Sequence, residues 1–274
     1  MATQKKGTEL APVENFMIPD RYAGMTDEQK AELLDELGDF AEETALNFNM
    51  IKVPSGGQLA FIVQGDEDGD ENYEKEIEAV IVFTHRLNGY WPNALGQSDD
   101  GNKAPDCSSM DGQTGVDRLT GEIKNCSTCP FNEFGSDRNG KGKACKNMRR
   151  LYLIRNNDPN LYMLSVPPTS VRDVNRQLTK IMATKSIPYT GLLIALKLQK
   201  TQNADGISYS KIVLEKRGVL PANIAAQAAA MRNEIKKQHV QAAITLDDYI
   251  AEPTTAPESD GFTDVAPSDL PFPG

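Results

Sequence analysis

All four cysteines of this 274-residue chain lie in one stretch, and this clustering constrains the fold more than any other feature. The inner pair, Cys126 and Cys129, forms a C-x-x-C motif, and single cysteines flank it at Cys107 and Cys145. Four thiolates supply the soft, tetrahedral ligand set that Zn²⁺ prefers. The stretch is rich in glycine and poor in apolar residues, so a metal would supply folding energy that burial cannot. We therefore predict a structural zinc ion here, with four reduced, buried thiols as the alternative reading.

The charges of the chain are distributed unevenly. The net charge is −10, yet residues 1–50 and 247–274 each contribute −7, so the middle of the chain is positive. Within it, residues 141–217 hold 15 Lys and Arg against 4 Asp and Glu. A basic centre between acidic ends is typical of proteins that bind polyanions. A solvated face of an ordinary domain is the alternative reading.

Apolar periodicity predicts a mainly β chain with helices, of the α+β class. The predicted strands are 58–63, 76–91, 149–155, 161–166, 192–200 and 207–216, and the predicted helices begin near Pro168 and Pro221. The order is two strands, the cysteine segment, two strands, a helix and two strands. This order fits an OB-like five-stranded barrel, in which the helix lies between the third and fourth strands. We expect the barrel to carry an inserted zinc-binding segment and flanking helices.

The chain divides into three predicted parts. Residues 1–50 hold a polar segment and an acidic amphipathic helix that starts at Thr26, where Gln29 completes a capping box. Packing on the core is the simpler reading of this helix, and association with another protein is the alternative. Residues 51–246 form the OB-like core, with the zinc segment at 105–147. Residues 247–274 are acidic and proline-rich, which predicts a disordered tail.

Basic and aromatic side chains are interleaved in and around the cysteine segment. Single-strand binders combine cations that attract phosphates with aromatic rings on which bases stack. The candidate nucleic-acid contacts are Lys141, Lys143, Lys146, Arg149, Arg150, Arg155, Tyr90, Trp91, Phe131, Phe134 and Tyr152. Each aromatic also has a reading as a core residue. We find no catalytic constellation, so the chain is not expected to be an enzyme.

Several motifs in residues 107–170 resemble phage-encoded single-stranded-DNA-binding proteins that join an OB-like barrel to a cysteine-rich zinc element. They are Cys126-x-x-Cys129-Pro130, Phe134-Gly-Ser136, Gly140-Lys-Gly-Lys-Ala-Cys145 and Pro167-Pro-Thr-Ser170. The tail residues Asp269, Leu270, Pro271 and Phe272 also resemble the acidic tip of bacterial single-strand-binding proteins, although Pro273 and Gly274 follow.

The resemblance implies a protein that coats single-stranded DNA, or RNA, during replication or recombination and recruits partner enzymes through its tail. Four cysteines in one patch and no recognisable export signal predict a reducing cytoplasm, that of the host bacterium if the chain is phage-encoded. No membrane contact is expected, and the oligomeric state is not predicted. A zinc-ribbon adaptor for a replication, recombination or transcription enzyme is the alternative. A metal-dependent nuclease is a third, weaker reading.

Overall fold

The structure is a computed structural model, and it describes residues 12–20, 24–39, 48–65, 67, 69–92, 104–203, 206–239, 244–245 and 248. Strands dominate this part of the chain, and the predicted mainly β, α+β class is confirmed. The helices are α1 (Asp27–Asp39), α2 (Pro168–Lys185) and α3 (Ala222–Gln238), with 3-10 turns η1 (Pro130–Asn132) and η2 (Tyr189–Gly191). The strands are β1 (Phe48–Lys52), β2 (Phe61–Gln64), β3 (Glu71–Glu74), β4 (Glu76–Tyr90), β5 (Cys107–Ser109), β6 (Thr114–Asp117), β7 (Ile123–Asn125), β8 (Lys146–Ile154), β9 (Leu161–Val166), β10 (Leu192–Gln202) and β11 (Ser208–Val219). None of the helices in these ranges has both the length and the apolar character needed to cross a membrane.

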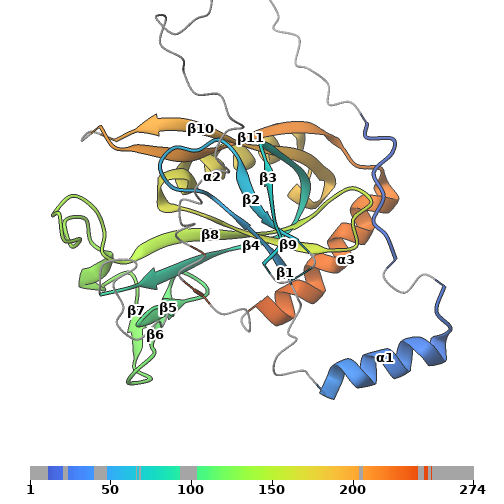
Figure 1. The fold of residues 1–274 in the computed structure, drawn as a ribbon, viewed down its shortest axis with the longest axis horizontal. Helices are drawn as coiled ribbons and strands as arrows, with labels where there is room; N and C mark the ends of the chain where they lie inside the picture. The colour runs from blue at the N-terminus through green and yellow to red at the C-terminus, as the bar shows by residue number, and fades with distance from the viewer. Residues whose placement is uncertain are drawn as a thin grey trace, which may run out of the picture.

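Eleven strands of the described residues form one mixed sheet (Figure 1). The main path runs β3-β2-β1-β9-β8-β4-β5-β6-β7, and β10 pairs with β4 and β11 off this path. The ladders are antiparallel except that of β1 with β9, which is parallel. One edge of the long strand β4 pairs with β8, and its other edge pairs first with β10 and then with β5. This strand therefore connects the core to the cysteine segment.

Apolar side chains cover both faces of the sheet. Alternate residues of β4 point to opposite faces, so Ile81 belongs to one apolar cluster and Val82 to the other. Helix α2 buries Val174 in the first cluster, and helix α3 buries Ala228 in the second. Because both faces of the central strands are covered, their residues are buried whichever way they point.

A closed five-stranded barrel is not shown. Among the described residues, β3 and β11 each pair with only one other strand, so the ladders leave the sheet open. Strand β11 nevertheless contacts the segment that leads into β2, since the Ser210 hydroxyl donates to the Gln58 carbonyl at 2.7 Å. The order of the predicted strands and helix is confirmed, and the cysteine segment is inserted after β4 as expected.

The first helix begins as its sequence predicts. The Thr26 hydroxyl accepts a bond from the Gln29 backbone N–H at 3.2 Å, and the Gln29 amide oxygen accepts one from the Thr26 N–H at 3.0 Å. This is the reciprocal pair of a capping box. Figure 1 draws α1 apart from the sheet. The packing on the core that the sequence favours is not seen there among the described residues, and association with another protein stays a prediction.

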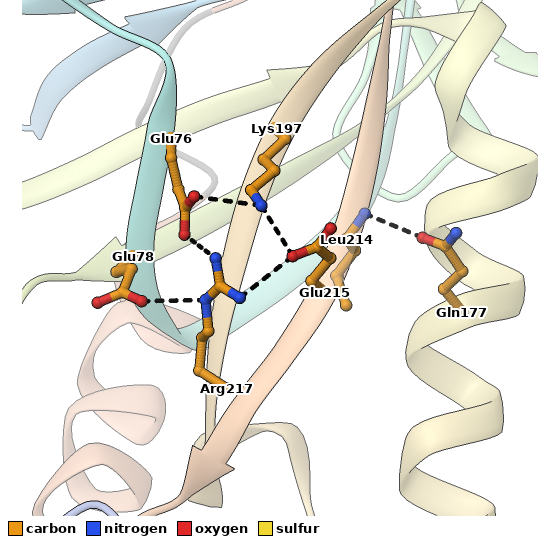
Figure 2. Close-up of polar contacts among 7 residues, drawn as sticks. All are labelled: Glu76, Glu78, Gln177, Lys197, Leu214, Glu215 and Arg217. Atoms are coloured by element: carbon orange, nitrogen blue, oxygen red, sulfur yellow. Dashed lines mark hydrogen bonds and ion pairs between the residues drawn. The ribbon is translucent and has the colours of Figure 1, made fainter.

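A network of ion pairs crosses β4, β10 and β11 (Figure 2). Arg217 pairs with Glu76, Glu78 and Glu215, and Lys197 pairs with Glu76 and Glu215. The Arg217 guanidinium, through its hydrogen bond, holds the pKa of the Glu76 carboxyl below its usual value although burial opposes this. The charges of Lys197 and Arg217 are therefore compensated within the sheet.

Candidate functional site

The cysteine segment extends the sheet beyond the core as a small meander. Strand β5 pairs with the end of β4, with Cys107 opposite Tyr90, and β6 and β7 follow as antiparallel neighbours. Asp111 and Asp117 fix its turns, since one carboxylate oxygen of each accepts backbone N–H bonds from residues two and three positions further on. The Lys124 ammonium, 2.8 Å from Asp117, holds the pKa of that carboxyl far below its usual range. Polar bonds therefore replace an apolar core here.

All four cysteines line one cavity of about 120 Å³ at the base of this meander. All are free thiols, and Cys126 and Cys145 are buried. A Cβ on Gly115 would lie 3.1 Å from the Cys107 sulfur and 3.6 Å from the Cys126 sulfur. Both sulfurs are close to that one Cβ position, so the distance between them cannot exceed 3.1 Å and 3.6 Å added together. A tetrahedral Zn²⁺ with thiolates at about 2.3 Å would draw such a pair to about 3.8 Å.

Their surroundings favour the protonated thiol at Cys107 and Cys145. Burial raises the pKa of Cys145 to about 12 and also raises the pKa of Cys107, and the neighbouring cysteines add to both effects. As the side chains stand, no group of three or more His, Cys, Asp or Glu residues within the described ranges could hold a metal ion. The sequence prediction thus brings the right four residues to one cavity, and the zinc itself stays a prediction.

An exposed aromatic and cationic surface lies beside the cysteine cavity. Phe134 is 82% exposed, and the Lys143 ammonium lies 5.1 Å from the centre of its ring. The rings of Tyr90 and Phe131 stack with centroids 4.3 Å apart and planes 15° apart. The same surface is hollowed by two cavities that share Lys146. One, of about 240 Å³, is lined by residues that include Tyr90, Trp91, Phe131 and Arg138, and the other, of about 470 Å³, by residues that include Phe134, Lys143, Asn147 and Arg172.

Seven of the eleven candidate nucleic-acid contacts belong to this surface or its loop. We call it the knuckle surface: Tyr90, Trp91, Phe131, Phe134, Lys143 and Lys146 line its cavities, and the exposed Lys141 lies in the adjoining loop 135–142. This loop is closed on itself, since the Gly135 N–H donates to the Gly142 carbonyl at 2.8 Å. Aromatic rings and cations that the sequence separates are therefore gathered around two cavities that share Lys146.

Two of the candidates are buried and cannot contact nucleic acid, which corrects the prediction for them. Arg150 and Tyr152 are 0% exposed on β8. Arg150 donates to both carboxylate oxygens of Asp248 at 2.7 Å, and Ser165 donates to the same carboxylate. Asp248, assigned by the sequence to the tail, is thus held in the core.

The two other arginines of the candidate set are also not on the knuckle surface. Arg155 forms a two-bond pair with Glu74, at 2.8 and 2.7 Å, so its charge is compensated. Arg149 is half-buried and lies opposite Arg86 on the neighbouring strand. Sequence reasoning missed Arg86, Arg138 and Arg172. Two sequence features could have pointed to the last two of these: the glycine-rich loop that contains Arg138, and the prolines that start α2 just before Arg172.

Comparison with family profiles, curated proteins and solved structures finds no match. The chain's own geometry therefore carries the functional argument. The predicted partner-binding residues Asp269, Leu270, Pro271 and Phe272 lie outside the described residues.

Proposed function

We propose that this chain binds single-stranded DNA on the knuckle surface, without reading its sequence. The observation that carries the proposal is Phe134, a ring left 82% exposed beside the Lys143 ammonium. Burying such a ring is favourable, so an exposed ring beside a cation and the neighbouring rings of Tyr90 and Phe131 offers a surface that a ligand can cover. A base stacked on an aromatic ring contributes about 1–3 kcal/mol, and nearby cations attract the phosphates. RNA offers the same bases and charges, so the test includes it.

A structural zinc ion on the four cysteines is part of this proposal. The thiols would have to lose their protons and turn into the cavity, which a divalent cation favours because it lowers the pKa of a coordinating thiol. The support is the shared cavity and the close approach of Cys107 and Cys126 around Gly115. Bound zinc would hold the meander against the end of β4 and residues 130–134, the two segments that carry the aromatic rings.

An OB-like arrangement of the core is likewise proposed. The support is the position of α2 between β9 and β10, and the contact of Ser210 with Gln58 across the open side of the sheet. In such a barrel the exposed edge strands and loops bind oligonucleotides. The cysteine segment would extend that binding face. The motif resemblance, and not the geometry, is the support for the rest of the proposal: action in DNA replication or recombination in a bacterial cytoplasm, with the tail recruiting partner enzymes.

The decisive experiment is a titration of the fluorescence of Trp91, the one tryptophan of the chain, with oligo-dT and oligo-U at several salt concentrations. We expect quenching, and binding that weakens steeply with salt because bound phosphates release counterions. Phe134→Ala should weaken binding about 5- to 150-fold, the equivalent of one stacked base. Tyr73→Ala is the matched control, since Tyr73 is 48% exposed on the distant strand β3.

The full chain and a variant without residues 250–274 should both be titrated, because an acidic tail can compete with phosphates for the cations. Absence of binding by both proteins at low salt would end the proposal. Equal losses in Phe134→Ala and Tyr73→Ala would also count against the knuckle surface.

A second candidate, a zinc-ribbon adaptor protein, is favoured by one feature of the β6–β7 hairpin. Val116, Leu119 and Ile123 are 46%, 72% and 73% exposed there. Exposed apolar patches often mark protein contacts. Replacing Leu119 and Ile123 with aspartate should leave oligo-dT binding intact if DNA is the ligand of the knuckle surface. If those changes alone abolish the chain's activity in a reconstituted replication assay, the adaptor reading is favoured.

A further inference from the structure

Two arginines face each other on the sheet between the core and the knuckle surface. Arg86 on β4 and Arg149 on β8 are direct cross-strand partners in an antiparallel ladder. Directly opposite residues share a face of the sheet, with Cβ atoms about 4.5–5.5 Å apart. The two side chains therefore leave neighbouring positions on one face of the sheet, with Arg86 exposed and Arg149 half-buried.

Neither of these two arginines has a carboxylate partner in the part of the chain that the structure describes. The Arg149 Nη1 donates to the Thr84 hydroxyl at 3.1 Å, and its Nε is buried without a hydrogen-bond partner. Burial, and then the charge of Arg86, lowers the pKa of Arg149. Like charges directly opposite each other destabilise a sheet, so packing does not explain this pair.

Other arginines of the same sheet are paired with acids. Arg150 binds Asp248, Arg155 binds Glu74, and Arg217 lies among three glutamates (Figure 2). Unlike these three arginines, Arg86 and Arg149 lack a carboxylate partner among the described residues. They lie toward the end of β4 and the start of β8, where both strands meet the cysteine segment. An anion from outside the chain would supply the counter-charge.

The neighbours of the pair lead to the knuckle surface. Asn88 and Asn147 are the next residues on the same face, and the Asn147 amide donates to the Asn88 side chain at 2.8 Å. Asn147 also lines the cavity of about 470 Å³ with Phe134, Lys143 and Arg172. Two residues along a strand span about 7 Å, so the pair lies roughly one such step from this cavity.

We propose that Arg86 and Arg149 together bind a phosphate group. This rests on the proposed function in one respect: the phosphate is assigned to the DNA strand whose bases lie at Phe134. Guanidinium groups match phosphate geometry through paired N–H donors, and the exposed Arg86 presents such donors to solvent beside the half-buried Arg149. Free phosphate offers the same chemistry, so the experiment separates the two sources.

The test compares Arg86→Met and Arg149→Met with Arg217→Met, which removes a cation that already has acidic partners. Binding of labelled oligo-dT is measured by anisotropy over a range of salt concentrations. We expect each of the first two variants to weaken binding about tenfold and to reduce the slope of log K against log salt by about 0.7, the value for one phosphate contact on a single strand. Arg217→Met should change neither quantity.

Stability gives a second readout that a structural role would not produce. Removing Arg149 relieves its repulsion with Arg86, so Arg149→Met should unfold at the same or a higher urea concentration while binding less tightly. If it binds normally but is less stable, the site is overturned. Arg86 is exposed, so Arg86→Met keeps the test valid even if Arg149→Met fails to fold.

The outcomes separate this site from the proposed function. If Phe134→Ala loses binding and both arginine variants keep full affinity and slope, the phosphate site is wrong and the proposed function stands. If neither the wild type nor any variant binds oligo-dT, the melting temperatures of the wild type and of Arg86→Met are measured with and without inorganic phosphate. A phosphate-dependent rise that Arg86→Met abolishes would then support the site with free phosphate as its ligand, and no rise would overturn it.

Discussion

Replacing Asp248 with asparagine would leave the Arg150 guanidinium buried without a counter-charge. Arg150 is 0% exposed, and its Nη2 donates to both oxygens of that carboxylate at 2.7 Å. Breaking a buried ion pair by removing one partner costs about 3–5 kcal/mol. For a domain of this size each kcal/mol lowers the melting temperature by about 2–4 °C, so the expected fall is about 6–20 °C.

The assay is urea and thermal unfolding of the full chain, followed by circular dichroism. The double variant Arg150→Met with Asp248→Asn removes the unpaired charge, so it should recover much of the stability lost by Asp248→Asn alone. A matched pair of truncations gives the same contrast, since a chain ending at residue 249 keeps Asp248 and one ending at residue 246 lacks it. A loss below about 1 kcal/mol for Asp248→Asn would refute the reasoning, because it would place Arg150 in water.

The cysteine cavity, the half-buried His85 and the ion-pair network can each be tested by substitution. Cys129→Ser should lower metal content, measured by plasma emission spectrometry, and thermal stability together, and Gly115→Ala should do so more weakly because its Cβ meets the Cys107 sulfur at 3.1 Å. Burial lowers the pKa of His85 from 6.5 to about 4. The His85 imidazole therefore binds a proton more readily in the unfolded chain than in the folded one. The free energy of unfolding should fall by about 1–3 kcal/mol as the pH drops from 6.5 to 4, and this fall should be smaller in His85→Asn. A flat profile in the wild type would contradict this. Arg217→Ala should cost about 1 kcal/mol or less by urea unfolding, because the network is partly exposed; a loss of several kcal/mol would show that it is buried.

The parts of the fold with strong local periodicity were predictable. The alternating pattern of β4 predicted its start at Glu76, as observed, and an end at Trp91, one residue past the observed end at Tyr90. The predicted and observed bounds of β9 are the same. The capping residues Thr26 and Gln29 gave the start of α1. These features depend on residues close together in the chain. The parallel pairing of β1 with β9 was missed, because no local pattern encodes a partner more than a hundred residues away.

The candidate site was predicted in part, for the same physical reason. The four cysteines lie close in sequence, and their grouping around one cavity follows from that. The basic run on β8 was misread, because its burial depends on partners distant in sequence. Arg150 meets Asp248 across 98 positions, and Arg155 meets Glu74 across 81. Net charge along the chain cannot show which cations are already paired.

The most direct test of the account is ultraviolet crosslinking of oligo-dT to the full chain, with the crosslinked residues identified by mass spectrometry. The account predicts crosslinks at Phe134 and at the neighbouring rings of Tyr90, Trp91 or Phe131, and their loss in high salt. Crosslinks at Tyr73 on β3 or Tyr209 on β11, with none on the cysteine segment, would contradict it.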